Sequence, residues 1–263
     1  MKKLIINIYN YVKYHLWYSS FKRKLTDTLK VREGRIKLFE KYFCYHYGKA
    51  FYITYNEVFT NEIYRFETQS NNPVIIDCGA NMGLSILFFS MKYPNAEIIA
   101  FEPDESVLPF LEKNILNYKL NNVQLIKSAV WVEETELKFF TDEGMGGRVN
   151  KSYENQIPQT IKAVRLRDYL SRKIDMLKID IEGSEYMILR DCDNLLINVN
   201  HIFIEYHSFI DDNQHLEDVL SILKKNGFRY HLKESFSRER PFIDKELVCE
   251  KFDMAINIFG YKN

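Results

Sequence analysis

The chain has 263 residues, of which 46% are hydrophobic and 27% are charged. This composition is typical of a globular protein and excludes a disordered, collagen-like or membrane-embedded chain. Lys and Arg together number 36, as do Asp and Glu, so that the formal net charge is zero. Proteins that mainly bind nucleic acid usually carry a large basic excess, and we therefore expect no nucleic-acid partner.

The neutral total conceals two parts of opposite charge. Residues 1–50 contain 12 Lys and Arg against 3 Asp and Glu, so the remaining 213 residues carry a net charge of minus nine. Apolar residues recur at helical spacing between Leu4 and Leu16, which predicts an amphipathic helix over residues 4–17. We expect this helix to dock on the body of the protein or on a second subunit of a homo-oligomer. The alternative is a peripheral contact with an anionic membrane surface.

The four cysteines, Cys44, Cys78, Cys192 and Cys249, are widely separated and include no C-x-x-C pair. Such spacing is typical of free thiols in a reducing cytosol. No apolar stretch reaches the roughly 18 residues that a membrane-spanning helix needs. We therefore expect a cytoplasmic protein, peripheral to the inner face of the membrane if the N-terminal helix lies on it.

A run of turn-forming residues from Ser70 to Pro73 predicts a boundary between an N-terminal helical and aromatic extension, residues 1–70, and a domain over residues 71–263. Beyond it, short apolar runs alternate with helical ones. Strands are expected at 74–77, 97–102, 123–127, 174–180, 201–205, near Tyr230 and at 254–259, and helices at 84–93, 105–118, 184–190 and 216–225. A polar, hairpin-like excursion is expected at 136–140. The alternation predicts an α/β fold, a Rossmann-like, doubly wound sheet of seven strands with helices on both faces.

A glycine-rich turn from Asp77 to Gly83 lies between the first of these strands and its helix. Glycine lets the backbone turn sharply and approach a ligand without a Cβ atom in the way. The spacing Gly79-x-x-x-Gly83 differs from the G-x-G-x-x-G of dinucleotide-binding domains, and no G-x-x-x-x-G-K-[ST] phosphate loop is present. The turn therefore indicates a nucleotide-type ligand other than a dinucleotide or a nucleoside triphosphate.

Two acids border this turn in the expected order of strands. Glu102 ends the second strand, where a carboxylate can accept hydrogen bonds from both hydroxyls of a ribose. Asp77 is placed to hold the cationic amino acid end of a ligand, or the turn itself. Together these features suit S-adenosylmethionine as the cofactor.

Four segments resemble the FkbM family of S-adenosylmethionine-dependent methyltransferases, which have the class I methyltransferase fold. They run from Asp77 to Gly83, from Ala100 to Pro103, from Leu177 to Glu185 and from Glu205 to His207. The pattern K-I-D-x-E-G-x-E at residues 178–185 is the most specific of them, and the resemblance covers about residues 50–235. It implies an O-methyltransferase that acts on a hydroxyl of a sugar, a glycolipid or a related metabolite.

The resemblance also places Ser128 and Ala129 at the adenine. With them, the expected cofactor site comprises Asp77, Gly79, Ala80, Asn81, Met82, Gly83, Glu102, Pro103, Ser128, Ala129 and Asp180. Two other functions stay open: a binding or accessory module of the same fold without turnover, and a methyltransferase for a small molecule other than a carbohydrate. The presence of both the cofactor acids and the polar groups at the later strand ends favours an enzyme.

Four polar residues follow or end the fourth and fifth expected strands: Asp180, Glu182, Glu205 and His207. Neighbouring parallel strands bring them to one crevice, where ligands of open parallel sheets bind. Transfer of a methyl group to a hydroxyl needs in-line placement of the oxygen and removal of its proton. His207 is the favoured catalytic base because histidine titrates near neutral pH, and Asp180 is the next candidate. In the alternative, Glu182 and Glu185 cap the helix start or form salt bridges around it, and only Asp180 and His207 touch the substrate.

The same crevice offers ligands for a divalent metal such as Mg²⁺. Asp180, Glu205 and His207 provide two carboxylates and an imidazole, enough to bind a cation that lowers the pKa of the substrate hydroxyl.

Two further segments are expected to border the site. Thr141 to Val149 is expected to be a loop at the substrate mouth, with Arg148 touching an anionic group, and residues 55–59, which include Glu57, are expected to form a lid.

Overall fold

The computed structural model describes residues 19–141, 147–149, 157–243 and 252–262. The expected helix at 4–17 and Cys249 lie outside these ranges. Cys44, Cys78 and Cys192 are free and buried, as expected. In the described ranges, no helix is both long and apolar enough to cross a membrane.

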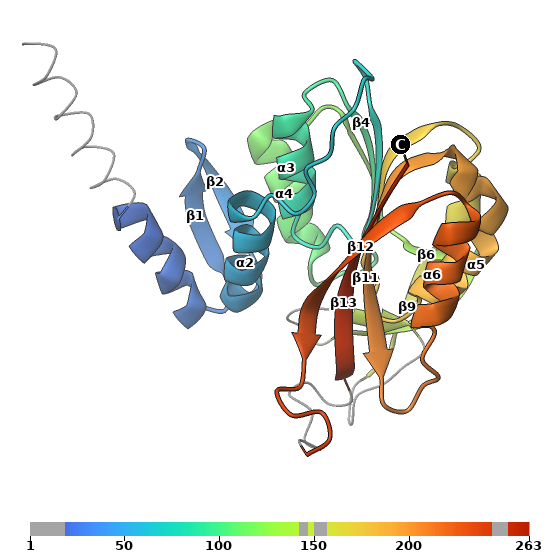
Figure 1. The fold of residues 1–263 in the computed structure, drawn as a ribbon. Coiled ribbons are helices and arrows are strands. Elements are labelled where there is room, and N and C mark those ends of the chain that lie inside the picture. The colour runs from blue at the N-terminus through green and yellow to red at the C-terminus, as the bar shows by residue number, and fades with distance from the viewer. Residues whose placement is uncertain (1–18, 142–146, 150–156, 244–251, 263) are drawn as a thin grey trace, which may run out of the picture.

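A central sheet of seven strands confirms the expected α/β architecture (Figure 1). In spatial order β12-β13-β11-β10-β3-β4-β5, its strands are β3 (Val74–Cys78), β4 (Glu97–Phe101), β5 (Val123–Ile126), β10 (Ile174–Ile179), β11 (Val199–Phe209), β12 (Arg229–Ser237) and β13 (Phe252–Tyr261). The five strands from β5 to β11 are parallel, and β13 runs antiparallel to β11 and β12. The carboxyl ends of the parallel strands therefore meet at one edge of the sheet.

Helices cover both faces of this sheet, as Figure 1 shows. On one face lie α3 (Leu84–Lys92) and α4 (Leu108–Tyr118), and on the other α5 (Glu185–Cys192) and α6 (Leu216–Lys225), with the short 3₁₀ turns η3 (Leu166–Tyr169) and η4 (Asp193–Asn198). Because both faces are covered, the central strands are apolar throughout rather than alternating. All six residues of β10 are buried, and two of them, Asp175 and Lys178, are charged.

A second sheet follows β5 and was only partly expected. Its four strands, in the order β6-β9-β7-β8, are β6 (Ala129–Trp131), β7 (Thr135–Thr141), β8 (Gly147–Val149) and β9 (Gln159–Arg165). The excursion expected at 136–140 is β7. The expectation that 141–149 is a loop was wrong at both ends, since Thr141 ends β7 and residues 147–149 are β8. Three residues are too few to show the alternation that identifies a strand.

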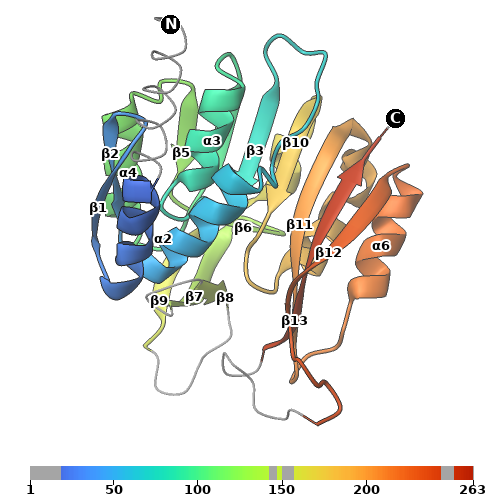
Figure 2. The same ribbon diagram turned by 60° about the vertical axis from the view of Figure 1, so that its left-hand side comes forward.

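An N-terminal layer, residues 19–60, packs outside α3 and α4 (Figure 2). After helical residues 19–27 come the turn η1 (Thr28–Lys30), the hairpin of β1 (Gly34–Leu38) and β2 (Lys41–Tyr45), and α2 (Gly48–Tyr55), which runs into the π-helical turn η2 (Asn56–Thr60). Phe43 and Phe51 are fully buried in one apolar cluster with Leu84 and Leu87 of α3. The layer therefore shares a core with the sheet domain, while a domain boundary at residue 70 stays a prediction.

One buried amide connects the layer to the glycine turn. The Asn114 side chain on α4 accepts a hydrogen bond from the backbone N–H of Cys44 (2.7 Å) and donates to the carbonyls of Cys44 (2.8 Å) and Met82 (2.9 Å). Each of these backbone groups is hidden from water, so losing its partner carries a desolvation cost. Asn114 thus holds β2 against the turn that precedes α3.

We predict that Asn114→Ala lowers the free energy of unfolding by about 2–4 kcal/mol, because it leaves three buried backbone groups unpaired. Asn117→Ala on the same helix is the control, since Asn117 makes one exposed hydrogen bond, to the Tyr42 carbonyl, and should cost about 0.5 kcal/mol or less. Urea unfolding measures both. Equal losses for the two variants would show that Asn114 does not secure the layer.

Candidate active site

A cavity of about 420 Å³ lies where β3, β4 and β10 end. This volume falls within the range of about 300–1,000 Å³ typical of small-molecule sites. Four parts of the fold contribute to its lining: the turns after the central strands, the second sheet, β11 with its neighbours β12 and β13, and the N-terminal layer.

The glycine turn has a left-handed backbone at Gly79, Asn81 and Gly83, with φ angles of 87°, 48° and 92°. A Cβ atom on Gly79 would lie 2.0 Å from the carbonyl oxygen of Asp180. Only glycine fits there, because the ends of β3 and β10 approach so closely. Asparagine is one of the few other residues that tolerate this conformation, which explains Asn81 at a position where many methyltransferases have glycine.

Glu102 directly follows β4 and is buried in the lining of the cavity, beside the glycine turn. We call this part of the cavity its cofactor end. The Glu102 carboxylate accepts hydrogen bonds from the backbone N–H groups of Asn81 (2.7 Å) and Asp104 (2.9 Å). Each carboxylate oxygen has a second lone pair, so two ribose hydroxyls can still donate to it. Burial raises the pKa of Glu102 to about 7. These features fit the ribose of S-adenosylmethionine.

The other expected cofactor residues divide into two groups. Those in the cavity lining are Gly79, Ala80, Asn81, Met82, Pro103, Ser128, Ala129 and Asp180. Asp77 and Gly83 are absent from the lining formed by described residues. Asp77 is instead fully buried behind the turn, where it accepts a 2.5 Å hydrogen bond from the Ser85 hydroxyl. Of the two roles considered for Asp77, holding the turn is the one that this position allows.

Lys178 is a central residue of the site to which the sequence pattern assigned no role. Its ammonium group lies 3.1 Å from Asp77 Oδ1 and 3.4 Å from Asp180 Oδ2, and it donates a 2.9 Å hydrogen bond to the Gly79 carbonyl. Burial opposes its charge, but Asp77 and Asp180 outweigh burial and hold the pKa of Lys178 well above its ordinary value. A lysine within the apolar run of β10 is the sequence signal that points to this ion network.

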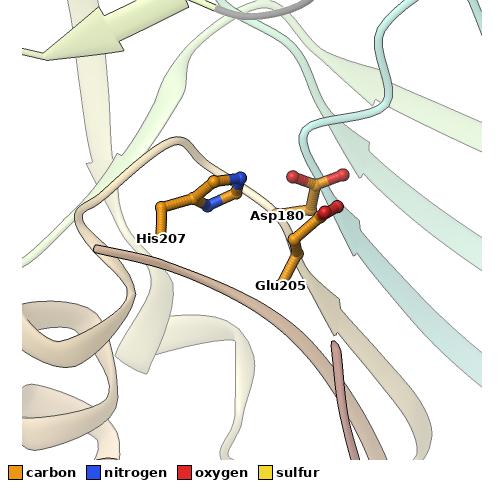
Figure 3. Close-up of side chains that lie close together, drawn as sticks. All are labelled: Asp180, Glu205 and His207. Atoms are coloured by element: carbon orange, nitrogen blue, oxygen red, sulfur yellow. The ribbon is translucent and has the colours of Figure 1, made fainter. Parts of the chain in front are cut away.

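The acidic end of the cavity forms because β11 extends beyond β10. Ile179, the last residue of β10, pairs with Ile204, while β11 continues to Phe209 alongside β13. The strand is thus longer than expected, and residues 205 and 207 share one face of it. The side chains of Asp180, Glu205 and His207 point toward one another (Figure 3), with their ligand-type atoms all within 4.8 Å.

Two glutamates hold the His207 ring. Nδ1 lies 2.9 Å from Glu185 Oε1 and Nε2 lies 3.6 Å from Glu182 Oε2. Burial alone lowers the pKa of His207, but the charges of Glu182 and Glu185 outweigh it and hold this pKa well above its ordinary value. The charges of the two glutamates favour the protonated ring, so the ordinary pKa of histidine no longer supports His207 as the catalytic base, and the identity of the base stays a prediction. Glu185 pairs with His207 beside the start of α5, and contact of Glu182 or Glu185 with substrate stays a prediction.

Half-buried carboxylates surround this end of the cavity. Burial, opposed by His207, raises the pKa of Glu182 to about 7, and burial with the nearby charge of Asp180 raises the pKa of Glu205. Glu182 has a left-handed backbone, with a φ angle of 59°, a strained conformation that clusters at functional sites. The arrangement concentrates negative charge where an acceptor hydroxyl would lie.

Two residues that were expected to border the site do line the cavity. Arg148, on β8, is buried with its guanidinium 4.3 Å from the centre of the Phe209 ring. Glu57, on the π-helical turn, also lines the cavity, and burial together with the charges of Glu205 and Asp180 raises its pKa to about 7. The N-terminal layer therefore contributes to the site, whereas closure of a lid stays a prediction.

The sheet order, the glycine turn after the central strand and the acid that ends the next strand define a class I methyltransferase fold. The sequence model named "Methyltransferase FkbM domain" matches residues 77–230, which is more than half of the chain. The chain therefore belongs to the FkbM methyltransferase family, and it is an enzyme of the methyltransferase class.

Three named relatives are each less than 30% identical to the chain in sequence. The chain is 29% identical to "Methyltransferase sdnD" of Sordaria araneosa over 53% of this chain and 68% of that protein. It is 23% identical to "31-O-demethyl-FK506 methyltransferase FkbM" of Streptomyces tacrolimicus (69% and 82%) and 24% identical to "2-O-methyltransferase NoeI" of Sinorhizobium fredii (51% and 63%). The crystal structure of methyltransferase FkbM from Methylobacillus flagellatus is similar with a TM-score of 0.48 at 16% identity, over 76% of this chain and 46% of that chain.

We predict that Lys178→Met lowers the free energy of unfolding by about 3–5 kcal/mol, because it leaves the carboxylate of Asp77 buried without its cation. The double variant Lys178→Met with Asp77→Asn should recover much of this loss, since it removes both charges. Urea unfolding of the single and double variants measures the coupling. A loss below about 1 kcal/mol for Lys178→Met, or no recovery in the double variant, would contradict the ion network.

Proposed function

We propose that the protein is an S-adenosylmethionine-dependent O-methyltransferase that methylates a hydroxyl of a sugar, a glycolipid or a related small metabolite. One observation carries the proposal: a single cavity connects buried Glu102, suited to a ribose, with Asp180, Glu205 and His207. Two relatives named for O-methylation, the FK506 and NoeI enzymes, support the choice of oxygen as the acceptor atom.

Different residues bind the cofactor and the acceptor, at the two ends of the cavity. Bound S-adenosylmethionine supplies the electrophilic methyl group. Glu102 accepts hydrogen bonds from the ribose hydroxyls, and the backbone at Gly79 admits the ligand close to Asp180. In-line placement of the acceptor oxygen against the methyl group supplies much of the rate enhancement. As the bond from oxygen to the methyl carbon forms and the bond from sulfur breaks, the hydroxyl proton passes to Asp180 or Glu205, because Glu182 and Glu185 raise the pKa of His207 and disfavour its neutral, basic form.

Asp180, Glu205 and His207 also fit a divalent cation such as Mg²⁺. Glu185 accepts a hydrogen bond from the Nδ1–H group of His207, the outer contact that metal-binding histidines usually make, and a neutral ring would then offer Nε2, 3.6 Å from Glu182 Oε2, as the ligand atom. When bound, such a cation lowers the pKa of a coordinated hydroxyl. The metal-free route through a carboxylate base is the competing version of the same proposal.

We predict that S-adenosylhomocysteine, the demethylated cofactor, binds the protein and that Glu102→Ala weakens its binding at least tenfold. Two lost hydrogen bonds to a charged group, about 1.5–3 kcal/mol each, account for such a loss. Calorimetric titration measures the affinity. Glu105→Ala, which changes an exposed acid three residues along the chain, should leave it unchanged. Full affinity in Glu102→Ala would argue against this cofactor site.

For the cation, we predict that Mn²⁺ binds with one site per chain and that Asp180→Asn abolishes this site. Titration followed by electron paramagnetic resonance measures free Mn²⁺ directly, and Glu217→Gln, an exposed acid on α6, is the control. Once an acceptor is known, methyl transfer is measured after rigorous chelation. Undiminished turnover there, or Mn²⁺ binding that survives Asp180→Asn, eliminates the metal version.

A further inference from the structure

Two walls at the acidic end of the cavity lie outside the segment that the family shares. The FkbM domain match covers residues 77–230, and it contains the glycine turn, Glu102 and the acids at the ends of β10 and β11. Glu57 precedes this segment, and Ser235 and Phe236 follow it, yet all three line the same cavity. The proposed cofactor and catalytic groups thus lie within the matched segment, whereas these walls belong to the extensions on either side.

The wall formed by β12 is shaped by a β-bulge. The register between β12 and β13 shifts between Glu234 and Phe236, which leaves Ser235 as the extra residue. Bulges redirect side chains and are enriched next to active sites. Here the Ser235 hydroxyl donates a 2.5 Å hydrogen bond to Glu205 Oε1, and Phe236 lines the cavity beside it. The bulge therefore orients Glu205 and adds an apolar surface at the acceptor end.

The second wall is formed by a π-helical turn. Such turns are rare and occur often at functional sites, because the extra residue alters where side chains point. Glu57 is the second residue of this turn and is half-buried at the cavity. Within the part of the chain that the structure describes, its carboxylate has no hydrogen bond or ion pair. The cations among the described lining residues have other contacts: Lys178 pairs with Asp77 and Asp180, His207 contacts Glu182 and Glu185, and Arg148 lies over the Phe209 ring. The exposed Lys233 on β12 acts on Glu57 through its charge, which lowers the pKa of Glu57.

We propose that Glu57 binds the acceptor by accepting a hydrogen bond from one of its hydroxyl or ammonium groups, and that the site selects acceptors without an anionic group. This rests on the proposed methyltransferase function. A half-buried carboxylate that accepts no hydrogen bond from the protein is stabilised by a ligand that donates one. A carboxylate or phosphate on the acceptor would instead lie near the negative charges of Glu57, Asp180 and Glu205, which repel it. Phe236 is placed to pack against the apolar face of a sugar ring.

Three probes that share a pyranose ring test the proposal: glucosamine, methyl α-glucoside and glucuronate, each titrated into protein saturated with S-adenosylhomocysteine. Ligand-observed nuclear magnetic resonance measures affinities in the millimolar range. We expect the first two to bind at least ten times more tightly than glucuronate. Glu57→Gln should weaken at least one of these two at least tenfold, while Glu67→Gln, an exposed acid of the preceding linker to β3, should change nothing.

The pattern of losses identifies the donor. A larger loss for glucosamine assigns an ammonium donor, and equal losses for both sugars assign a hydroxyl. Glucuronate that binds as tightly as the others, unchanged affinities in Glu57→Gln, or the absence of binding by all three sugars would overturn the proposal. S-adenosylhomocysteine affinity is measured in the same variants and should be unchanged. If the unmodified protein fails to bind it, the proposed function is contradicted rather than the role of Glu57.

Discussion

The buried ammonium group of Lys178 is the interaction on which the site depends. A charge that is only 2% exposed within a parallel sheet is costly unless it is paired and hydrogen-bonded. Asp77 on β3 and Asp180 after β10 supply the pairing, and the Gly79 carbonyl supplies the hydrogen bond. One side chain thereby fixes the turn at the cofactor end relative to the acid at the acceptor end.

The topology of the sheet explains why the chemistry gathers at this edge. Parallel strands bring the turns after β3, β4 and β10 together, and the antiparallel strand β13 extends β11 so that Glu205 and His207 reach the same cavity. The N-terminal layer and the bulge in β12 also contribute residues to the lining of this cavity. The family segment supplies the reaction machinery, and we infer that its flanking segments supply acceptor selection.

The parts of the fold that were predictable from sequence are those encoded locally. Apolar runs and glycines identified β3, α3 and β4, and the positions of all seven strands of the central sheet were expected within a few residues, except that β11 and β12 are longer. The three-residue strands β6 and β8 carry too little pattern to be recognised. The N-terminal layer is held by aromatic contacts with α3 and α4, which no local spacing encodes.

In the candidate site, too, the features encoded locally were predictable from the sequence, and those that depend on packing were not. Motif order indicated Glu102, Asp180, Glu205 and His207, which all line one cavity. The pairing of Lys178 with Asp77 joins residues about a hundred positions apart on neighbouring strands, and the pKa of His207 depends on burial and on Glu182 and Glu185, which lie more than twenty positions earlier in the chain. Interactions of this kind follow from register and packing. They emerge only when the strands are placed side by side.

A crystal structure of the complex with S-adenosylhomocysteine would show whether Glu102 and the ion network of Lys178 position the ligand. We predict that both ribose hydroxyls lie within about 3 Å of the Glu102 carboxylate and that the sulfur atom is directed toward Asp180 and Glu205, with Lys178 still bound to the Gly79 carbonyl. A nucleoside bound outside this cavity, or one whose ribose contacts Asp180 instead of Glu102, would contradict this prediction.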